Sequence, residues 1–424
     1  MKKIYSLLTI LGTLVATGTL LRCTIETASG PTPYTVFPGE GISPTTNSIG
    51  KGSKKFTIPG SMVMSGVGRW VTVTPETGGD QSIYMKGIVK EYNRNNGTFI
   101  VDVTDYNGSG EFDSWKVVLE KTMAEVLDSV RQAYTDLSFG MFIHFNMSTF
   151  DRCCCDRCYS VSGEWGVGVN RAPAKLFRPS QLDCGQWMDA AKAAGCKYTI
   201  LTAKHHDGFC LWPTKYTEYS VKNATVTTDV CKQFADSARS RGLRVGFYYS
   251  MKDLTNGYAL DFVKGQLREL LTNYGDILCL WFDGWGWEAG YNKVPYDTIN
   301  ALIKSIQPRC LIVENNHEFS TVHSDMLEWE MPIDGPPPIT NTKPAEGNEP
   351  IRYSPTDKER CWFWHPEGNC DLMTAQMIVS NLRHNNEGNA AYLLDLTPDT
   401  LGLIPECQVD RMKEVGDSLG IPRS

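Results

Sequence analysis

From about residue 121 onward, apolar strand-like runs alternate along the chain with amphipathic helical segments. The runs are FGMFIHF (139–145), KYTILTAKHHDG (197–208), RVGFYYS (244–250), DILCLWFDG (276–284), CLIVENN (310–316) and AAYLLDL (390–396). Strands that alternate with helices form parallel β/α units, and a parallel sheet covered on both faces has almost continuously apolar strands. About three hundred residues of this pattern favour a closed barrel over an open sheet. We therefore expect an α/β fold in which residues 121–424 form a (β/α)8-like, TIM-type barrel.

The segment before the barrel has a different rhythm. Residues 31–50 are rich in Pro, Gly, Ser and Thr and are expected to be a linker. Residues 51–120 contain short alternating stretches separated by GG, NNG and NGSG turns, which predicts a small all-β module. Its pattern, GSKKFTIPGSMVMSGVGRWVTV (52–73) followed by YMKGIVKEYN (84–93), resembles a β repeat of phage-tail and other surface-attachment proteins. That resemblance implies attachment to a larger surface or particle.

Residues 1–30 have the form of an export signal. Lys2 and Lys3 precede an apolar run over 4–21, and a polar stretch of small residues follows. The run is also near the lower length limit for a membrane-spanning anchor, so cleavage and retention both stay open. Lipid attachment at Cys23 is disfavoured because Arg22 stands where a small residue is needed. We expect an exported protein that is periplasmic, cell-surface or extracellular.

Charge and cysteine usage narrow the choice of partners. A net charge of −7 argues against nucleic acid as a partner, because nucleic-acid binding depends on clustered Lys and Arg.

Four of the fourteen cysteines, Cys153, Cys154, Cys155 and Cys158, are close together. They could form disulfides, belong to an ordinary loop or bind a metal. Adjacent residues point in different directions, which makes a tetrahedral zinc site at this cluster difficult and favours the disulfide or the ordinary loop. No cofactor is expected for the chain.

Polar side chains follow the apolar runs at the places where the expected strands end. They are His144, Lys204, His205, His206, Asp207, Tyr248, Trp281, Asp283, Asn315, Asn316, His317 and Glu330. The carboxyl ends of barrel strands line the active site, so these groups should meet at one rim. Each of these residues alone could have a purely structural role, because a single His after a strand is often an ordinary loop residue and Asp-Gly is usually a turn. Their convergence is what predicts a site.

The chemistry suggested by this rim is that of paired carboxyl groups. Asp283 follows a deeply apolar strand, where a charge is costly unless it is used. A second carboxyl group could come from Asp325, Glu328 or Glu330, and neighbouring strands about 4.8 Å apart would bring the two close together. A pair about 5 Å apart is the arrangement of retaining glycosidases. Imidazoles both donate to and accept from hydroxyl groups, so His205 and His206 are expected to bind sugar rather than metal.

Several motifs together resemble glycoside hydrolase family 29, the α-L-fucosidases. They are FGMFIHF, GEW (163–165), the block FRPSQLDCGQWMDAAKAAGCKYTILTAKHHDGFCLWPTKYTEYSVKN (177–223), RGLRVGFYYS (241–250) and LWFDG (280–284). The resemblance implies a retaining exo-α-L-fucosidase that acts on fucosylated oligosaccharides or glycoconjugates without a metal. It implies that Asp283 is the nucleophile and that the fucose is held by His144, Glu164, Trp165, His205, His206, Tyr248 and Trp281. The segment SDMLEWE (324–330) implies Glu330 as acid/base, with Glu328 as its rival.

Two other functions stay open. A fucose-binding attachment protein with a weak or inactive site would fit the β module. A retaining exo-glycosidase for a sugar that differs only at C6, such as galactose, would fit the carboxyl pair. Turnover of aryl fucoside and aryl galactoside separates all three.

Overall fold

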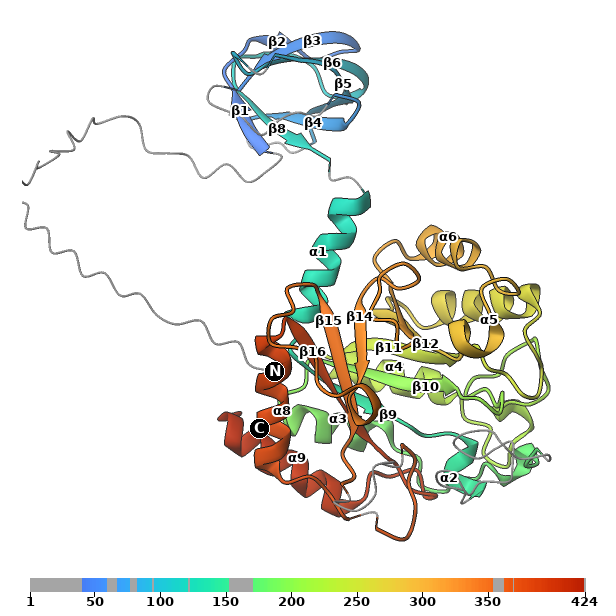
Figure 1. Cartoon of the computed structure of the whole chain (residues 1–424). Helices are drawn as coiled ribbons and strands as arrows, with labels where there is room; N and C mark the ends of the chain where they lie inside the picture. Colours follow the sequence, from blue (N-terminus) through green and yellow to red (C-terminus); the bar gives the residue numbers. More distant parts are fainter. Residues whose placement is uncertain are drawn as a thin grey trace, which may run out of the picture. The chain divides into compact units, whose positions relative to one another are not determined.

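The computed structural model describes residues 40–58, 67–76, 82–93, 95–120, 123–151, 171–353, 362–368 and 370–422. The chain divides into two compact units, residues 1–120 and 121–424 (Figure 1). The predicted export signal and the cluster from Cys153 to Cys158 lie outside the described residues. In the part of the chain that is described, no helix is both long and apolar enough to span a membrane.

The first unit is built from short antiparallel strands. They are β1 (Glu40–Ser43), β2 (Asn47–Ser48), β3 (Gly52–Thr57), β4 (Trp70–Pro75), β5 (Tyr84–Asn93), β6 (Thr98–Asn107), β7 (Glu111–Phe112) and β8 (Trp115–Leu119). Six of them form one sheet in the order β1-β8-β4-β5-β6-β3. Alternate side chains face a small core, among them Phe56, Val73 and Trp115. The period of two seen in the sequence therefore produces a sheet with one buried face.

The linker expected over 31–50 is wrong for its last part. Residues 40–43 pair with β8, and β2 pairs with β7. The hydroxyl groups that suggested a linker have structural roles, because Ser43 Oγ and Thr45 Oγ1 accept hydrogen bonds from the amide of Thr57 at 3.0 and 3.1 Å. An edge strand needs few apolar residues, so composition alone does not separate it from a loop.

The second unit contains a nearly closed eight-stranded parallel barrel, which confirms the predicted fold. Its strands are β9 (Phe139–Ile143), β10 (Tyr198–Lys204), β11 (Arg244–Ser250), β12 (Cys279–Asp283), β13 (Leu311–Asn315), β14 (Leu327–Glu330), β15 (Ala345–Pro350) and β16 (Ala390–Leu396). They are hydrogen-bonded in the order β13-β12-β11-β10-β9-β16-β15-β14. Between β13 and β14, Asp325 and Ser324 bond to β13 instead, at Ile312 O (2.7 Å) and at the Glu314 amide (3.2 Å).

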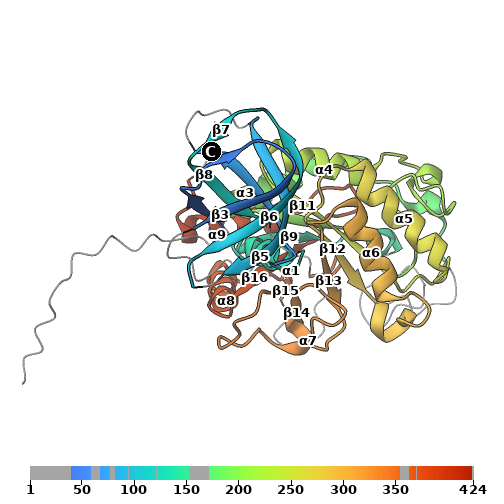
Figure 2. The same ribbon diagram turned by 90° about the horizontal axis from the view of Figure 1, so that it is seen from above.

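Helices cover the outside of the barrel (Figures 1 and 2). They are α3 (Cys184–Ala193), α4 (Val230–Ser240), α5 (Leu260–Asn273), α6 (Tyr296–Ile306), α8 (Ala375–Glu387) and α9 (Glu406–Leu419). Asp183, Asp229 and Thr374 cap the amino ends of α3, α4 and α8 through their side chains. The described connection from β13 to β14 has no helix, and the β14–β15 connection contains only the short α7 (Met331–Asp334).

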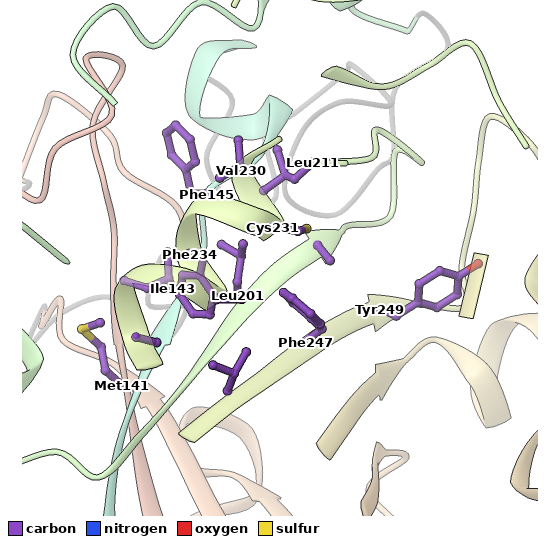
Figure 3. Close-up of a cluster of buried hydrophobic side chains, with 14 of the residues drawn as sticks. Met141, Ile143, Phe145, Leu201, Leu211, Val230, Cys231, Phe234, Phe247 and Tyr249 are labelled. Carbon is purple, nitrogen blue, oxygen red and sulfur yellow. The ribbon is translucent and has the colours of Figure 1, made fainter. Parts of the chain in front are cut away.

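Strand residues alternate between the helix layer and the barrel interior. Figure 3 shows Leu201 and Phe247 on the outer face, near α4. The ring centroid of Phe247 lies 6.3 Å from that of Phe234, which belongs to α4. The interior is filled by side chains that include Phe142, Ile200, Trp281, Val313 and Leu393. Gly140 is needed there, because a Cβ atom would lie 2.3 Å from the Tyr198 ring.

The bottom of the barrel is closed by α1 (Met123–Thr135), which precedes β9. Tyr134 of α1 is fully buried and donates a hydrogen bond to Glu346 of β15. Tyr198 and Trp281 donate to the same carboxyl group, at 3.1 and 2.8 Å. One buried glutamate thus joins α1, β10, β12 and β15, and the opposite end of the barrel is where the polar strand ends meet.

Candidate active site

A pocket opens at the carboxyl ends of the barrel strands. It contains about 540 Å³ of space free of protein atoms, part of it open to solvent. Its walls are formed by Phe142, His144, His205, His206, Tyr248, Trp281, Asp283, Trp287, Asn315, His317, Glu330, Ile333, Asn348 and Trp362. The predicted catalytic and fucose-binding residues that the structure describes are all in this set. Of the other strand-end residues, Lys204, Asp207 and Asn316 are not, and Lys204 instead donates to Asp253 at 2.9 Å. Glu164 and Trp165 lie outside the described residues.

Asp283 is the last residue of β12, and its side chain is 13% exposed. Its Oδ2 accepts a hydrogen bond of 2.9 Å from the Tyr248 hydroxyl and lies 3.7 Å from His206 Nε2. Its Oδ1 has no partner among the described residues. Burial raises the pKa of Asp283, while the hydrogen bonds from Tyr248 and from the Gly284 amide oppose that rise. Gly284 takes a left-handed conformation (φ 66°) that turns the chain directly after the carboxyl group.

Glu330 ends β14 and is 7% exposed. Its Oε2 accepts a hydrogen bond of 2.9 Å from Asn315 Nδ2. Burial raises the pKa of Glu330 to about 7, and the negative charges of Asp283 and Asp334 act in the same direction. Near neutral pH this carboxyl group can therefore hold a proton and give it away.

The sequence analysis expected the two carboxyl groups on neighbouring strands, and this expectation is wrong. Asp283 is on β12 and Glu330 on β14, and Asn315 of β13 pairs in register with Asp283 while it donates to Glu330. In a small barrel, alternate strands contribute side chains to the same interior layer, which explains why these two residues face one pocket.

The other two carboxyl candidates have structural surroundings. Glu328 is two residues before Glu330 on β14, pairs in register with Glu346, and is hydrogen-bonded by Asn348. It is not part of the pocket wall. Asp325 accepts from Lys304 Nζ at 2.6 Å and from the Ile312 amide at 2.8 Å, away from the pocket. The geometry therefore favours Glu330.

In His144 and His206, the hydrogen-bond partner of Nδ1 decides whether Nε2 is a donor or an acceptor. Burial lowers the pKa of His144 to about 3 and also lowers that of His206, so both rings are neutral. His144 Nδ1 donates to Asp395 of β16 at 2.8 Å. His206 Nδ1 lies 2.7 Å from Ser250 Oγ, whose proton goes to Lys252 O at 2.8 Å. Both Nε2 atoms are then acceptors, suited to the hydroxyl groups of a sugar.

Aromatic rings form the floor and one wall of the pocket. Tyr248 stacks on Trp281, with ring centroids 5.4 Å apart and an interplanar angle of 20°. His205 stacks on the same Tyr248 at 5.4 Å, and its Nδ1 has no partner among the described residues. Phe142 meets Trp281 edge-on at 5.4 Å. These faces offer an apolar wall for the methyl group of a deoxy sugar.

The sequence analysis missed several residues that line the pocket and one, Asp395, that is hydrogen-bonded to the pocket residue His144. Asp395 is the only charged residue in AAYLLDL, and that isolation in an apolar strand was an available signal. Asn348 is in AEGNEP, which gave no strand pattern. Trp287, Ile333 and Trp362 are in connections between strands, and no period marks them.

Asp334 forms a further link at the rim. Its Oδ2 accepts from His317 Nδ1 at 3.0 Å and from the Glu330 amide at 3.0 Å. His317 has a left-handed backbone (φ 54°) that is uncommon outside glycine. Asp334 therefore fixes both the imidazole and the end of β14. Among the described residues, no group of three or more His, Cys, Asp or Glu is arranged to hold a metal ion.

Comparisons with known proteins point in one direction. The model of the α-L-fucosidase family matches residues 116–422. α-L-Fucosidase 1 of Arabidopsis thaliana is 32% identical over 308 residues, which cover 66% of this chain and 57% of that protein. A putative α-L-fucosidase 1 of Oryza sativa is 32% identical over 296 residues, with shares of 62% and 53%. The chain thus spans a little over half the length of these two relatives.

Solved structures show the same likeness. α-L-Fucosidase isoenzyme 1 from Paenibacillus thiaminolyticus has a TM-score of 0.59 and 29% identity, over 70% of this chain and 76% of that one. A glycoside hydrolase 29 family member from an unknown rumen bacterium has a TM-score of 0.56 and 29% identity, over 68% and 56%.

Proposed function

We propose that this chain, which belongs to the α-L-fucosidase family, glycoside hydrolase family 29, is a retaining exo-α-L-fucosidase that removes terminal α-L-fucose from glycans. The single observation that carries the proposal is the placement of Asp283 and Glu330 in one pocket, beside neutral imidazoles and stacked aromatic rings. A paired carboxyl site with hydroxyl acceptors and an apolar wall suits a 6-deoxyhexose.

In the first step, Asp283 attacks the anomeric carbon and Glu330 gives its proton to the glycosidic oxygen. The bond from carbon to the leaving oxygen breaks, and a fucosyl ester forms on Asp283. In the second step, Glu330, now ionised, takes a proton from water, and the water oxygen displaces Asp283. The raised pKa of Glu330 suits the acid role, and the Tyr248 hydrogen bond favours the ionised form of Asp283.

The remaining pocket residues would bind the sugar. The Nε2 atoms of His144 and His206 accept from its hydroxyl groups, and Asp395 fixes the tautomer of His144. Trp281, Tyr248 and His205 would contact its less polar face. Glu164 and Trp165 keep their proposed role in fucose binding from the family resemblance.

Turnover of 4-nitrophenyl α-L-fucoside tests the proposal, with 4-nitrophenyl α-L-galactoside, which differs only by a hydroxyl group at C6, as the comparison. We expect hydrolysis of the fucoside with a kcat/KM about a hundredfold above that of the galactoside. Binding of fucose without turnover would instead support the attachment protein, and a preference for the galactoside would support the other exo-glycosidase. The intact carboxyl pair favours the enzyme.

We also propose export, with residues 1–30 as signal or anchor. The disulfide between Cys370 and Cys407 supports this, because disulfides persist mainly in oxidising compartments. Detection of the chain outside the cytoplasm, and its loss when residues 4–21 are deleted, would test it. Attachment to a larger surface through the β module stays a prediction from its resemblance.

A further inference from the structure

Part of the pocket wall comes from the connection between β15 and α8 rather than from a strand end. In this connection, Trp362 is 9% and Phe363 2% exposed, and Trp362 lines the pocket. The ring centroids of Trp362 and Phe363 lie 5.1 and 5.3 Å from that of His144. Phe363 also meets the His205 ring edge-on at 4.9 Å. These two aromatic side chains therefore pack against two of the imidazoles that are proposed to contact the sugar.

The two ends of the same connection are hydrogen-bonded to each other. The Tyr353 amide donates to Asp371 O at 2.7 Å. The Met373 amide donates to Ile351 O at 3.0 Å, and the Ile351 amide donates to the main-chain oxygen of Asp395 in β16 at 2.9 Å. The base of the connection is thus joined to the barrel by main-chain hydrogen bonds, and Trp362 and Phe363 lie beyond this base in the chain.

A covalent bond also joins this connection to the helix layer. Cys370 is between Phe363 and the base of the connection, and it forms a disulfide with Cys407 in the first turn of α9. The buried side chains of Met412 and Val415 fix α9 to the core of the barrel unit. A disulfide that holds a segment in its binding conformation reduces the conformational entropy that the segment loses when a ligand binds.

The disulfide is accessible from solvent, whereas the free thiols are not. Cys370 is exposed and Cys407 is half-buried. The six free cysteines among the described residues are all buried. Thiol–disulfide exchange requires a thiolate to reach one of the two sulfur atoms. A small dithiol can therefore attack this bond while the protein stays folded.

We propose that Cys370 and Cys407 are positioning residues of the active site, whose disulfide holds the Trp362–Phe363 wall against His144, so that its reduction weakens fucose binding. The inference rests on the proposed function. Reduction by a dithiol breaks the S–S bond and leaves two cysteine thiols, and the dithiol becomes a disulfide itself. The hydrogen bonds at the base of the connection remain, so the wall gains freedom while the fold is kept.

The Cys370→Ser/Cys407→Ser variant tests the positioning role. Turnover of 4-nitrophenyl α-L-fucoside is measured well below the melting temperature of the variant, with L-fucose as a competitive inhibitor. The sugar must now order the two aromatic side chains when it binds, so KM and the inhibition constant of L-fucose should rise about tenfold, and kcat should change by less than about threefold. Equal constants in variant and wild type would overturn the inference.

Trp362→Ala shows whether the disulfide acts through the wall. This variant should raise KM in the wild-type background by at least as much as loss of the disulfide does. Loss of the disulfide from Trp362→Ala should then raise KM by less than about twofold, because the two changes remove the same contact. Fully additive effects would mean that the disulfide does not act through Trp362, and would contradict the proposal.

Met412→Ala is the matched control for stability. Met412 is fully buried in α9, the helix that carries Cys407, and loss of its side chain should lower the free energy of unfolding by about 2–5 kcal/mol. This is comparable with the loss expected for the disulfide, yet KM should stay at the wild-type value. A rise in KM as large as in the cysteine variant would show that any loosening of α9 disturbs the site, and would overturn the specific role.

A redox titration of the wild-type chain is the second measurement. KM is measured in mixtures of reduced and oxidised dithiothreitol, and alkylation followed by mass spectrometry gives the fraction of Cys370 present as thiol. The rise in KM should follow this fraction and reverse on reoxidation. A KM that is independent of the Cys370 thiol would contradict the inference and leave the proposed function intact. An oxidised wild-type protein that does not turn over the fucoside would overturn the proposed function itself.

Discussion

At the scale of single residues, burial sets the proton affinity of Glu330, the proposed acid/base, and a nearby charge adds to it. Burial raises the pKa of Glu330 to about 7, and the charges of Asp283 and Asp334 act in the same direction. The general acid must be protonated, so kcat/KM should fall as pH rises above about 7. In Asp334→Asn the pKa of Glu330 is lower, and this alkaline limb should move down by roughly half a pH unit. A pH profile of kcat/KM checks this, and a limb that stays in place or moves upward would contradict it.

The choice between Glu330 and Glu328 gives a second prediction. Only Glu330 reaches the pocket wall, so Glu330→Ala should slow substrates with poor leaving groups by about a thousandfold while hydrolysis of α-L-fucosyl fluoride changes little. Azide should restore part of the rate on an activated substrate and give the fucosyl azide. Glu328→Ala is the control, and azide rescue in that variant instead would move the acid/base assignment.

Strand ends made much of the site predictable. His144 and Asp283 were found because a polar group ends an apolar run, and this pattern follows from barrel geometry. Asp334 and Asp395 were not found, because they act on the site through His317, Glu330 and His144. Such contacts join residues far apart in the chain, and no local pattern encodes them.

At the scale of elements, β15 shows where sequence patterns fail. AEGNEP contains Gly, Pro and two Glu, yet all six residues are buried. A Cβ atom at Gly347 would lie 2.1 Å from Asn385 Oδ1, so any larger residue would require the buried Asn385 amide to move. The inward residues Glu346 and Asn348 are satisfied by donors and acceptors on other elements. A buried polar strand of this kind is defined by its neighbours rather than by its own composition.

Glu346 links these elements and gives a stability prediction. Burial raises its pKa from 4.5 to about 7, so the folded state binds this proton more tightly than the unfolded state does. The contribution of Glu346 to the free energy of unfolding should therefore be greatest below about pH 4.5. It should fall as pH rises from there through 7, by about 3 kcal/mol in total. Glu346→Gln should remove this fall, as measured by denaturant unfolding from pH 4.5 to 8.

Tyr134→Phe is the companion variant for that measurement. The Tyr134 hydrogen bond lowers the pKa of Glu346, so its removal should extend the fall in stability to higher pH. A slope that is identical in the wild type and in Glu346→Gln would contradict the role of this carboxyl group.

At the scale of the whole molecule, the change of rhythm near residue 121 coincides with the boundary between the two units, after Glu120. Before this boundary apolar residues alternate with a period of two, and after it apolar strand-like runs alternate with amphipathic helical segments. This change is visible in the sequence. The start of the β module was not, because β1 is polar and lies at an edge.

The disulfide between Cys370 and Cys407 should stabilise the barrel unit. It joins α9 to the segment after Trp362, across 37 residues, for which loop entropy predicts about 4 kcal/mol. Reduction, or replacement of both cysteines by serine, should lower the free energy of unfolding by about 4 kcal/mol. Dithiothreitol should lower the free energy of unfolding of the serine variant by less than that of the wild type. Equal stability of the oxidised and reduced proteins would show that the bond contributes nothing.

The central claim is that Asp283 becomes covalently bound to fucose. A 2-deoxy-2-fluoro-α-L-fucosyl fluoride tests it most directly, because the fluorine at C2 slows both steps and the reactive leaving group keeps the first one fast. Mass spectrometry of the digested protein should find the fluorofucosyl group on the peptide that contains Asp283, with loss of activity in proportion. A label on another residue, or undiminished turnover without any label, would contradict the account.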